Sequence, residues 1–516
     1  MEVSAYLAKS HQLFSSQLFH QVQMAGLFAD SKTFADAVPK QPVEAVLAAF
    51  EAQQPADDDA LRAFVDAHFD LPEQAKEPDV QSDDVNTYIE KLWPQLTRPG
   101  GGVTEGSLLP LPCPYLVPGG RFREIYYWDS YFTALGLMES GHVELVRNMV
   151  NNFIALQQNV GLIPNGSRTY YNSRSQPPVL ALMVRQLAGV AGDDADLNAF
   201  YLQALKREHA FWMNGYEDIS DATTAIQRVV RMPDGELLNR FWDDSATPRP
   251  ESYREDVEAA ANMDDEEACA FYRNIRAACE SGWDFSSRWL ADPQHLLTIQ
   301  TTDIVPVDLN SLMVILEQSI ASLSRQVNGG QCQEAQLWEE VAEARATAVN
   351  KYCWQPDAGV YVDFNHKLSV QSTVHALSTV LPLFAGIADK HQAAAVAGVL
   401  ETRFLKNGGL VTSLCETRQQ WDAPNGWAPL QWFAVQGLQS YEHNKLAGEV
   451  MSRWLNTVDT YYKANHTLME KYNVEDIATS ASGGEYEVQH GFGWTNGVTQ
   501  VFAKALRTGT PASSAL

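Results

Sequence analysis

Apolar residues at helical spacing dominate the chain from about residue 129 to 508. Roughly a dozen segments repeat apolar positions at i, i+3, i+4 and i+7, which predicts amphipathic helices. Strand-like alternation is rare and short, as in "GVYVDFN" (359–365). We therefore predict an all-α body. The clearest helical faces are Val143, Val146, Val150 and Phe153, then Leu309, Leu312, Met313, Leu316, Ile320 and Leu323 after the candidate N-cap Asp308, and Leu446, Val450, Met451, Trp454, Leu455 and Val458.

Residues 1–80 have a different character. They are helical and polar, include the acidic stretch "PADDDALRAF", and contain no loop that combines aromatic and acidic residues. We predict that 1–80 form an N-terminal helical extension packed on the body. No Gly/Ser-rich or Pro-rich linker divides the remainder, so 81–516 are predicted to be one catalytic domain. Many consecutive helices with the chemistry in their loops are consistent with a helical toroid.

Charge and composition narrow the class of partner. The 516 residues carry a formal net charge of −27, which repels nucleic-acid phosphates and favours a neutral substrate. The sequence contains no run of about eighteen apolar residues, so we predict no membrane span. The start, "MEVSAYLAKSHQLF", lacks the pattern of a secretory signal, and six scattered cysteines suggest free thiols. We expect a cytoplasmic monomer with no nucleic-acid or membrane partner.

Several loops combine aromatic rings with acids, arginines and glycines. The stretch "PGGRFREIYYWDSYF" (118–132) is the densest, and similar loops occur at 159–178, 245–256, 280–289, 419–432, 469–473 and 480–497. A sugar needs such a surface, because its C–H faces pack on rings while its hydroxyls need charged partners. Glycosidic cleavage also needs two carboxyl groups, one to donate a proton and one to attack or to activate water.

Signatures of other chemistries are missing from the sequence. There is no H-E-x-x-H motif and no pair of histidines at i, i+4, and there is neither a G-x-G-x-x-G fingerprint nor a phosphate-binding Walker loop. We predict no metal and no cofactor.

The loops "PGGRFREIYYWDSYF" and "QWDAPNGWAP" resemble the two signature motifs of trehalase, glycoside hydrolase family 37. "ESGWDFSSRW" and "EKYN…GGEYEVQHGFGWTNG" are similar to later motifs of the same family, in the same order, over roughly 115–500. The resemblance implies an (α/α)6 barrel without a metal. It also implies hydrolysis of α,α-trehalose to two glucose molecules with inversion of the anomeric configuration.

The resemblance also assigns roles to residues. Asp284 matches the general acid and Glu470 the general base that activates water. The chain departs from the family pattern in its short glycine segment, "SASGG", before Glu485, and the missing leader resembles the cytoplasmic type. The matched substrate contacts are Arg121, Trp128, Asp129, Asn165, Arg174, Ser175, Gln176, Arg249, Glu251, Gly282 and Glu485.

Simpler interpretations compete for some of these residues. Each arginine could serve a structural ion pair, and Asp422 is predicted only to order its loop. Trp128, Trp283, Trp421 and Trp427 could be core residues or walls of a sugar subsite. Three other functions stay open: another helical-toroid α-glucosidase, a phosphorylase, and a non-catalytic sugar-binding protein. Acids at both 284 and 470 disfavour the last.

The mechanism sets requirements on the two acids. An inverting pair lies about 6.5–9.5 Å apart to leave room for water, whereas a retaining pair lies about 5–5.5 Å apart. The general acid must keep its proton near neutral pH, so burial or a nearby negative charge is expected to raise the pKa of Asp284. Glu470 is expected to be ionised.

Overall fold

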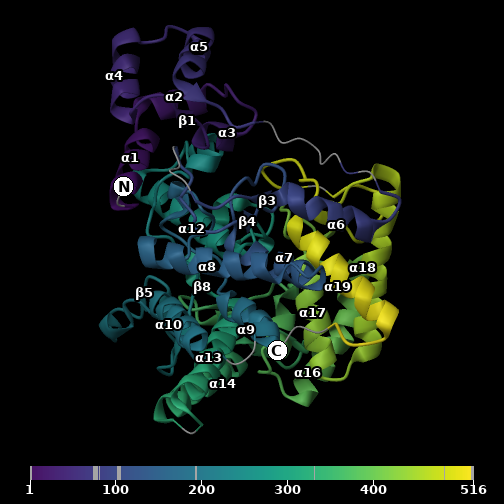
Figure 1. The fold of residues 1–516 in the computed structure, drawn as a ribbon. Helices are drawn as coiled ribbons and strands as arrows, with labels where there is room; N and C mark the ends of the chain where they lie inside the picture. The colour runs from purple at the N-terminus through teal and green to yellow at the C-terminus, as the bar shows by residue number, and fades with distance from the viewer. Residues whose placement is uncertain are drawn as a thin grey trace.

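The computed structural model describes residues 3–73, 80, 82–101, 106–191, 194–330, 332–481 and 483–512. Nineteen α-helices are found in this part of the chain, and its strands are only two or three residues long. The all-α prediction is thus confirmed (Figure 1).

Six helices contact one another in a closed ring, in the order α7, α9, α13, α15, α17, α19 and back to α7. Outer helices pack against this ring: α8 against α7 and α9, α10 and α14 against α13, and α18 against α17 and α19. The arrangement is the (α/α)6 toroid that the resemblance implied. The ring helices are α7 (Tyr127–Glu139), α9 (Leu180–Ala191), α13 (Val307–Asn328), α15 (Leu381–Phe384), α17 (Ala428–Ser440) and α19 (Gly493–Thr508).

Burial distinguishes the ring helices from the outer ones. Every residue from Tyr127 to Leu137 in α7 is buried, and so is every residue from Ala428 to Leu438 in α17. Both stretches are largely apolar on every side, and such a helix has to lie inside the protein. The outer helices α8 and α18 bury one face only, which is why their helical spacing was visible in the sequence.

The remaining elements connect and cover the ring. The other helices are α1 (Val3–Phe14), α2 (Gln17–Met24), α3 (Ser31–Ala35), α4 (Val43–Gln53), α5 (Asp58–His68), α6 (Val85–Leu96), α8 (Val143–Val160), α10 (Ala195–Trp212), α11 (Tyr253–Ala259), α12 (Asp265–Ser281), α14 (Gln333–Cys353), α16 (Lys390–Val399) and α18 (Asn444–Asn465). The strands are β1 (Val38–Pro39), β2 (Phe69–Asp70), β3 (Thr97–Arg98), β4 (Tyr115–Leu116), β5 (Ala225–Ile226), β6 (Val229–Arg231), β7 (Leu237–Asn239), β8 (Ile304–Val305), β9 (Trp354–Gln355), β10 (Val360–Tyr361), β11 (Phe364–Asn365), β12 (Val370–Gln371), β13 (Leu405–Lys406), β14 (Gly409–Leu410), β15 (Asn425–Trp427) and β16 (Lys471–Asn473).

The N-terminal helices α1 to α5 lie at one corner of the molecule (Figure 1). They share a separate hydrophobic cluster, in which Phe19 and Phe34 pack near Tyr126, Tyr170 and Tyr171 of the body. Helix α6 belongs instead to the main core. The predicted boundary falls between residues 80 and 81, and 81 lies outside the described residues, so the division stays a prediction that the two clusters support.

One local prediction was wrong. The N-cap of α13 is Pro306, and Asp308 lies in the first turn of the helix. Both Asp308 oxygens instead accept hydrogen bonds of 2.7 Å from Arg288, whose guanidinium also binds Asp363. Leaving a buried guanidinium group without a carboxylate partner costs more free energy than leaving the first N–H groups of a helix without this cap, because those N–H groups can use other acceptors. The segment "GVYVDFN" contains two short strands, β10 and β11, rather than one.

Candidate active site

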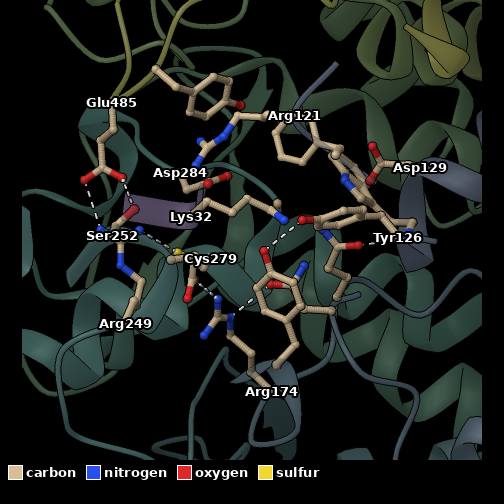
Figure 2. A pocket seen from close by; sticks show the side chains of 18 of the residues that line it. Lys32, Arg121, Tyr126, Asp129, Arg174, Arg249, Ser252, Cys279, Asp284 and Glu485 are labelled. Carbon is tan, nitrogen blue, oxygen red and sulfur yellow. Dashed lines mark hydrogen bonds and ion pairs between the residues drawn. The ribbon is translucent and has the colours of Figure 1, made fainter. Parts of the chain in front are cut away.

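A single cavity brings together most of the residues that the sequence singled out (Figure 2). It lies where loops from several parts of the toroid meet, and aromatic rings and charged groups share its wall. Eleven of the predicted site residues line it: Arg121, Trp128, Asp129, Asn165, Arg174, Gln176, Arg249, Glu251, Gly282, Asp284 and Glu485.

Two predicted residues do not line this cavity. Ser175 is buried beneath the wall, where its N–H donates to Glu280 (2.8 Å) and its hydroxyl to the Ile163 carbonyl (2.6 Å). Glu470 is also buried, at 1% exposure. Its charge nevertheless raises the pKa of Asp129, and its own pKa is raised by Asp284 and lowered by Arg121. Ser175 therefore shapes the wall, whereas Glu470 lies just behind it.

The loop after α12 brings Asp284 into the cavity. Helix α12 ends at Ser281, and its C-cap residue Gly282 has a φ of +76°. A Cβ there would lie 2.7 Å from the Trp128 ring, so glycine is needed both for the backbone angle and for the close approach. Two residues later, the Asp284 carbonyl accepts a hydrogen bond from Gln420 Nε2.

Asp422 holds the next part of this loop, as the sequence predicted in outline. Its carboxylate accepts from the Ser287 N–H (2.7 Å) and from the hydroxyls of Ser286, Ser287, Ser413 and Thr417. These bonds tie the segment after Asp284 to the loop that carries Trp421, so the two walls are fixed to each other.

The Glu470 backbone is fixed by the strand pair β15–β16, by the chain before α19 and by the first turn of that helix. Trp427 lies opposite Lys471 in the pair, the Glu470 N–H donates to the Gln489 carbonyl (3.0 Å), and the Trp494 ring N–H donates to the Glu470 carbonyl (2.8 Å). Its Oε1 is buried and has no hydrogen-bond partner in the described residues, and Lys471 Nζ is 3.9 Å away. Burying a carboxylate oxygen without a hydrogen-bond donor is costly, and the positive charge of Lys471 offsets part of that cost.

Burial raises the pKa of all three acids at the centre. The pKa of Asp284 rises to about 7, with Glu485 adding to the effect and Arg249 and Arg174 opposing it. Burial likewise raises the pKa of Glu470 to about 7, against Lys471 and Arg121. The pKa of Asp129 rises to about 8 because of burial first, then because of Asp284 and Glu470. Neighbouring acids of this kind influence each other's titration. Burial raises the pKa of Asp284 and of Glu470 to about the same value, so burial alone does not make Asp284 the protonated group and Glu470 the ionised one.

The arginines around the cavity are held by acids. Arg174 binds Glu251 (2.7 Å), Arg249 binds Asp256 (2.6 Å) and Glu485 (3.0 Å), and Arg121 binds Asp30 (2.7 Å). Figure 2 shows the Glu485 carboxylate joined by dashed lines to Arg249 and to Ser252, whose hydroxyl donates to it. Fixed guanidinium groups present donors to a hydroxylated ligand without large loss of side-chain entropy.

The glycine segment before Glu485 has a steric role. Gly483 and Gly484 both have positive φ, and Cβ atoms there would lie 2.7 Å from the Arg418 carbonyl oxygen and from Gln420 Oε1, respectively. Ser482 of this segment lies outside the described residues. The two glycines allow the loop to pass close to 418–420 and so bring Glu485 to Arg249.

Sequence reasoning missed several residues of the wall. Lys32 of α3 is the most informative: it lines the cavity, and its Nζ binds Asp36 (2.6 Å) and Glu124 (2.8 Å). No sequence motif identifies Lys32, because the burial of its partners Asp36 and Glu124 is visible only in the folded protein. Of the ambiguous tryptophans, Trp283 is a core residue stacked on Trp421, whereas Trp128, Trp421 and Trp427 reach the cavity. The other lining residues that were not singled out are Phe122, Tyr126, Tyr171, Ser252, Cys279, Tyr486, Phe492 and Trp494.

We expect Asp129→Asn to stabilise the protein increasingly as pH rises. The folded-state pKa of about 8 lies above the ordinary value of 3.8, so ionising the buried carboxyl costs folding free energy that accumulates between about pH 4 and pH 8. The neutral amide avoids this cost, and we expect the thermal midpoint to rise by about 3 °C at pH 8 and by clearly less at pH 5. The exposed Asp357→Asn is the control and should change neither value. An equal shift at both pH values would contradict the burial argument.

Neither a metal-binding cluster nor a membrane-spanning helix is found in the described part of the chain. It contains no cluster of three or more His, Cys, Asp or Glu side chains placed to hold a metal ion. None of its helices is long and apolar enough to cross a bilayer.

The family model for trehalase matches residues 26–506. The chain belongs to the trehalase family. Curated trehalase relatives agree: periplasmic trehalases of Escherichia coli O1:K1 / APEC and of strain SMS-3-5 / SECEC are 48% and 47% identical over 489 residues, 93% of this chain and 85% of theirs. The predictions of family membership and of a trehalase-type enzyme are confirmed.

Solved structures support the fold. Neutral trehalase Nth1 from Saccharomyces cerevisiae matches with a TM-score of 0.62 and 28% identity, over 77% of this chain and 76% of that one. A GH63 mannosylglycerate hydrolase from Thermus thermophilus matches with a TM-score of 0.53 at 18% identity, over 82% of this chain and 100% of that one. The second likeness shows the toroid alone.

The prediction of a cytoplasmic location is wrong. The curated relatives at 48% identity are named periplasmic trehalases, which points to the periplasm. The prediction rested on the first residues and on cysteines without disulfide spacing. Neither is a property of the folded barrel, and a domain with unpaired cysteines folds by the same packing in either compartment.

Proposed function

We propose that this chain hydrolyses α,α-trehalose to two glucose molecules with inversion at the attacked carbon. Asp284 donates its proton to the departing oxygen, and Glu470 removes a proton from the attacking water. The arginines, Asn165, Gln176 and Glu485 hold the sugar hydroxyls, and the tryptophans provide faces for the rings. Trehalose is the small-molecule substrate, and a monomer stays our expectation.

One observation carries the proposal: two buried carboxyl groups have pKa values raised to about 7, and Asp284 contributes to the rise at Glu470, at a cavity rich in aromatic rings and arginines. A carboxyl that titrates near neutral pH can serve as acid or as base. Their environments separate the roles. Asp284 lines the cavity under the opposing influences of Arg249 and Glu485, whereas Glu470 lies behind the wall with an unpartnered oxygen suited to hold water.

The stereochemistry of the first products tests the mechanism. With inversion, the attacked glucose leaves as the β anomer and the departing glucose as the α anomer, so early ¹H NMR spectra should show both in equal amounts. Retention would give α-glucose alone before mutarotation. Release of no glucose at all would instead contradict trehalose hydrolysis itself.

We expect Glu485→Gln to move the alkaline limb of the pH–rate profile to lower pH. The Glu485 carboxylate raises the pKa of Asp284, and Arg249 lowers it. Removing the negative charge, which also frees Arg249 from one partner, lowers the pKa of the acid by about half a unit. The proton needed for leaving-group departure is then lost earlier as pH rises.

The measurement is kcat/KM for trehalose between pH 5 and 9. Glu487→Gln, two residues away and exposed, removes the same charge and serves as the control. A limb that stays in place in Glu485→Gln would show that another group carries the transferred proton.

A further inference from the structure

A second cavity lies beside the small sheet β5–β7 and helix α12. It has a volume of about 850 Å³ and shares no lining residue with the candidate active site. Such a volume is in the range of small-molecule sites. Its wall includes Arg240, Trp242, Arg273, Asn274, His366 and Lys367.

Two arginines of this wall lie over one aromatic ring. The guanidinium carbons of Arg240 and Arg273 are 4.7 and 4.4 Å from the centre of the Trp242 ring. The ring fixes both planar groups by cation–π attraction. Fixed guanidinium groups of this kind form a ready-made fork for an anion.

Their hydrogen bonding is incomplete within the described residues. Arg240 is 5% exposed; its Nε donates to the Gln227 carbonyl (2.7 Å) and its Nη1 to the Thr302 carbonyl (2.6 Å), while Nη2 has no acceptor. The Arg273 side chain forms neither a hydrogen bond nor an ion pair with any residue that the structure describes. Arg273 is half-buried, and the unused nitrogens of both arginines are not among the buried atoms without a partner. They can therefore donate to a ligand that enters this cavity.

The wall of this second cavity carries more positive than negative side chains. Asp303 is the one carboxylate among the described lining residues, and it is already paired with Lys367 (2.7 Å). Asp303 also acts on Arg240, so one carboxylate is shared by Lys367 and two arginines among the described lining residues. Burial, together with Arg240, lowers the pKa of His366 to about 4, so this side chain is neutral. In a chain with a net charge of −27, this local excess of positive charge is unusual.

Burial also works against the charge on Arg240. It lowers the pKa of the guanidinium to about 10; Asp303 opposes this effect, and the positive charge of Arg273 adds to it. A negatively charged group in the cavity would raise the pKa of Arg240 again, because it would supply both a counter-charge and hydrogen-bond acceptors.

We propose that this second cavity binds a phosphoryl or sulfate dianion, either as the free ion or as the ester group of a small polyol. Tetrahedral oxyanions accept paired hydrogen bonds from guanidinium groups, which favours them over a single halide ion. The room beyond the two arginines is larger than one oxyanion needs, so an attached sugar or polyol also fits.

Arg273→Gln tests the site with little risk to the fold, because that side chain makes no polar contact with the described protein. Isothermal titration of the intact chain with inorganic phosphate, and separately with glucose 6-phosphate, should show binding that Arg273→Gln weakens about tenfold or more. Arg507→Gln, an exposed arginine in the last turn of α19, removes the same charge and should bind like the unmodified protein. Tighter binding of the ester than of phosphate would identify an esterified ligand, and equal binding the free ion.

Two results would overturn the proposal. One is equal affinity in Arg273→Gln and the unmodified chain, which would place any bound phosphate elsewhere, for example among the arginines of the active site. The other is the lack of binding of both probes at millimolar concentration.

Discussion

Asp284→Asn should lower kcat for trehalose by about 10³-fold, because general acid catalysis contributes about 10²–10⁴-fold. The amide has nearly the same shape and can still be held by the loop that Gln420 and Asp422 fix. It cannot supply the proton that the departing glucose oxygen needs. The measurement is the rate of glucose release at saturating trehalose.

A substrate with a better leaving group separates a missing proton from a damaged site. α-Glucosyl fluoride loses fluoride with much less help from an acid, so Asp284→Asn should retain far more of its activity on the fluoride than on trehalose. The thermal midpoint should stay the same or rise, because a buried carboxyl with a pKa raised to about 7 is removed. A near-normal rate on trehalose would exclude Asp284 from the acid role.

The fold was predictable where one face of a helix is apolar. Helices α8, α13 and α18 follow the expected apolar positions. Asp308 was misassigned because the sequence does not reveal that Arg288, twenty residues earlier, is buried beside it. Local preference for an N-cap was overridden by the larger cost of leaving a buried cation unpaired.

The site was predictable where motifs gather its residues in short loops. Eleven of the thirteen positions singled out line one cavity, whereas Ser175 and Glu470 lie behind its wall. Lys32 was missed because it comes from a helix about ninety positions before Arg121 and carries no local signal (121 − 32 = 89). The raised pKa of Glu470 was missed for a related reason: burial depends on which distant segments cover a side chain.

These observations link the N-terminal helices to the chemistry. Asp30 pairs with Arg121, and Lys32 reaches the cavity while it forms ion pairs with Asp36 and Glu124. Arg121 in turn lowers the pKa of Glu470. The position of α3 therefore affects the protonation of the proposed base through a single arginine, although the helix carries neither catalytic carboxyl.

Glu470→Gln should likewise lower kcat for trehalose by about 10³-fold, but its loss should respond to an added nucleophile. The amide cannot remove a proton from water, whereas azide needs no deprotonation and is small enough to take the place of that water. Sodium azide should therefore restore part of the rate in Glu470→Gln and yield β-glucosyl azide, while Asp284→Asn, with its base intact, should gain nothing. The configuration of the azide, read by ¹H NMR, shows the face from which it attacks: attack from the side of Glu470, opposite the departing oxygen, can give only the β product. Formation of α-glucosyl azide would mean that Asp284 first forms a covalent glucosyl intermediate that azide then displaces, so the two carboxyl groups would have to act as a retaining pair with Asp284 as the nucleophile.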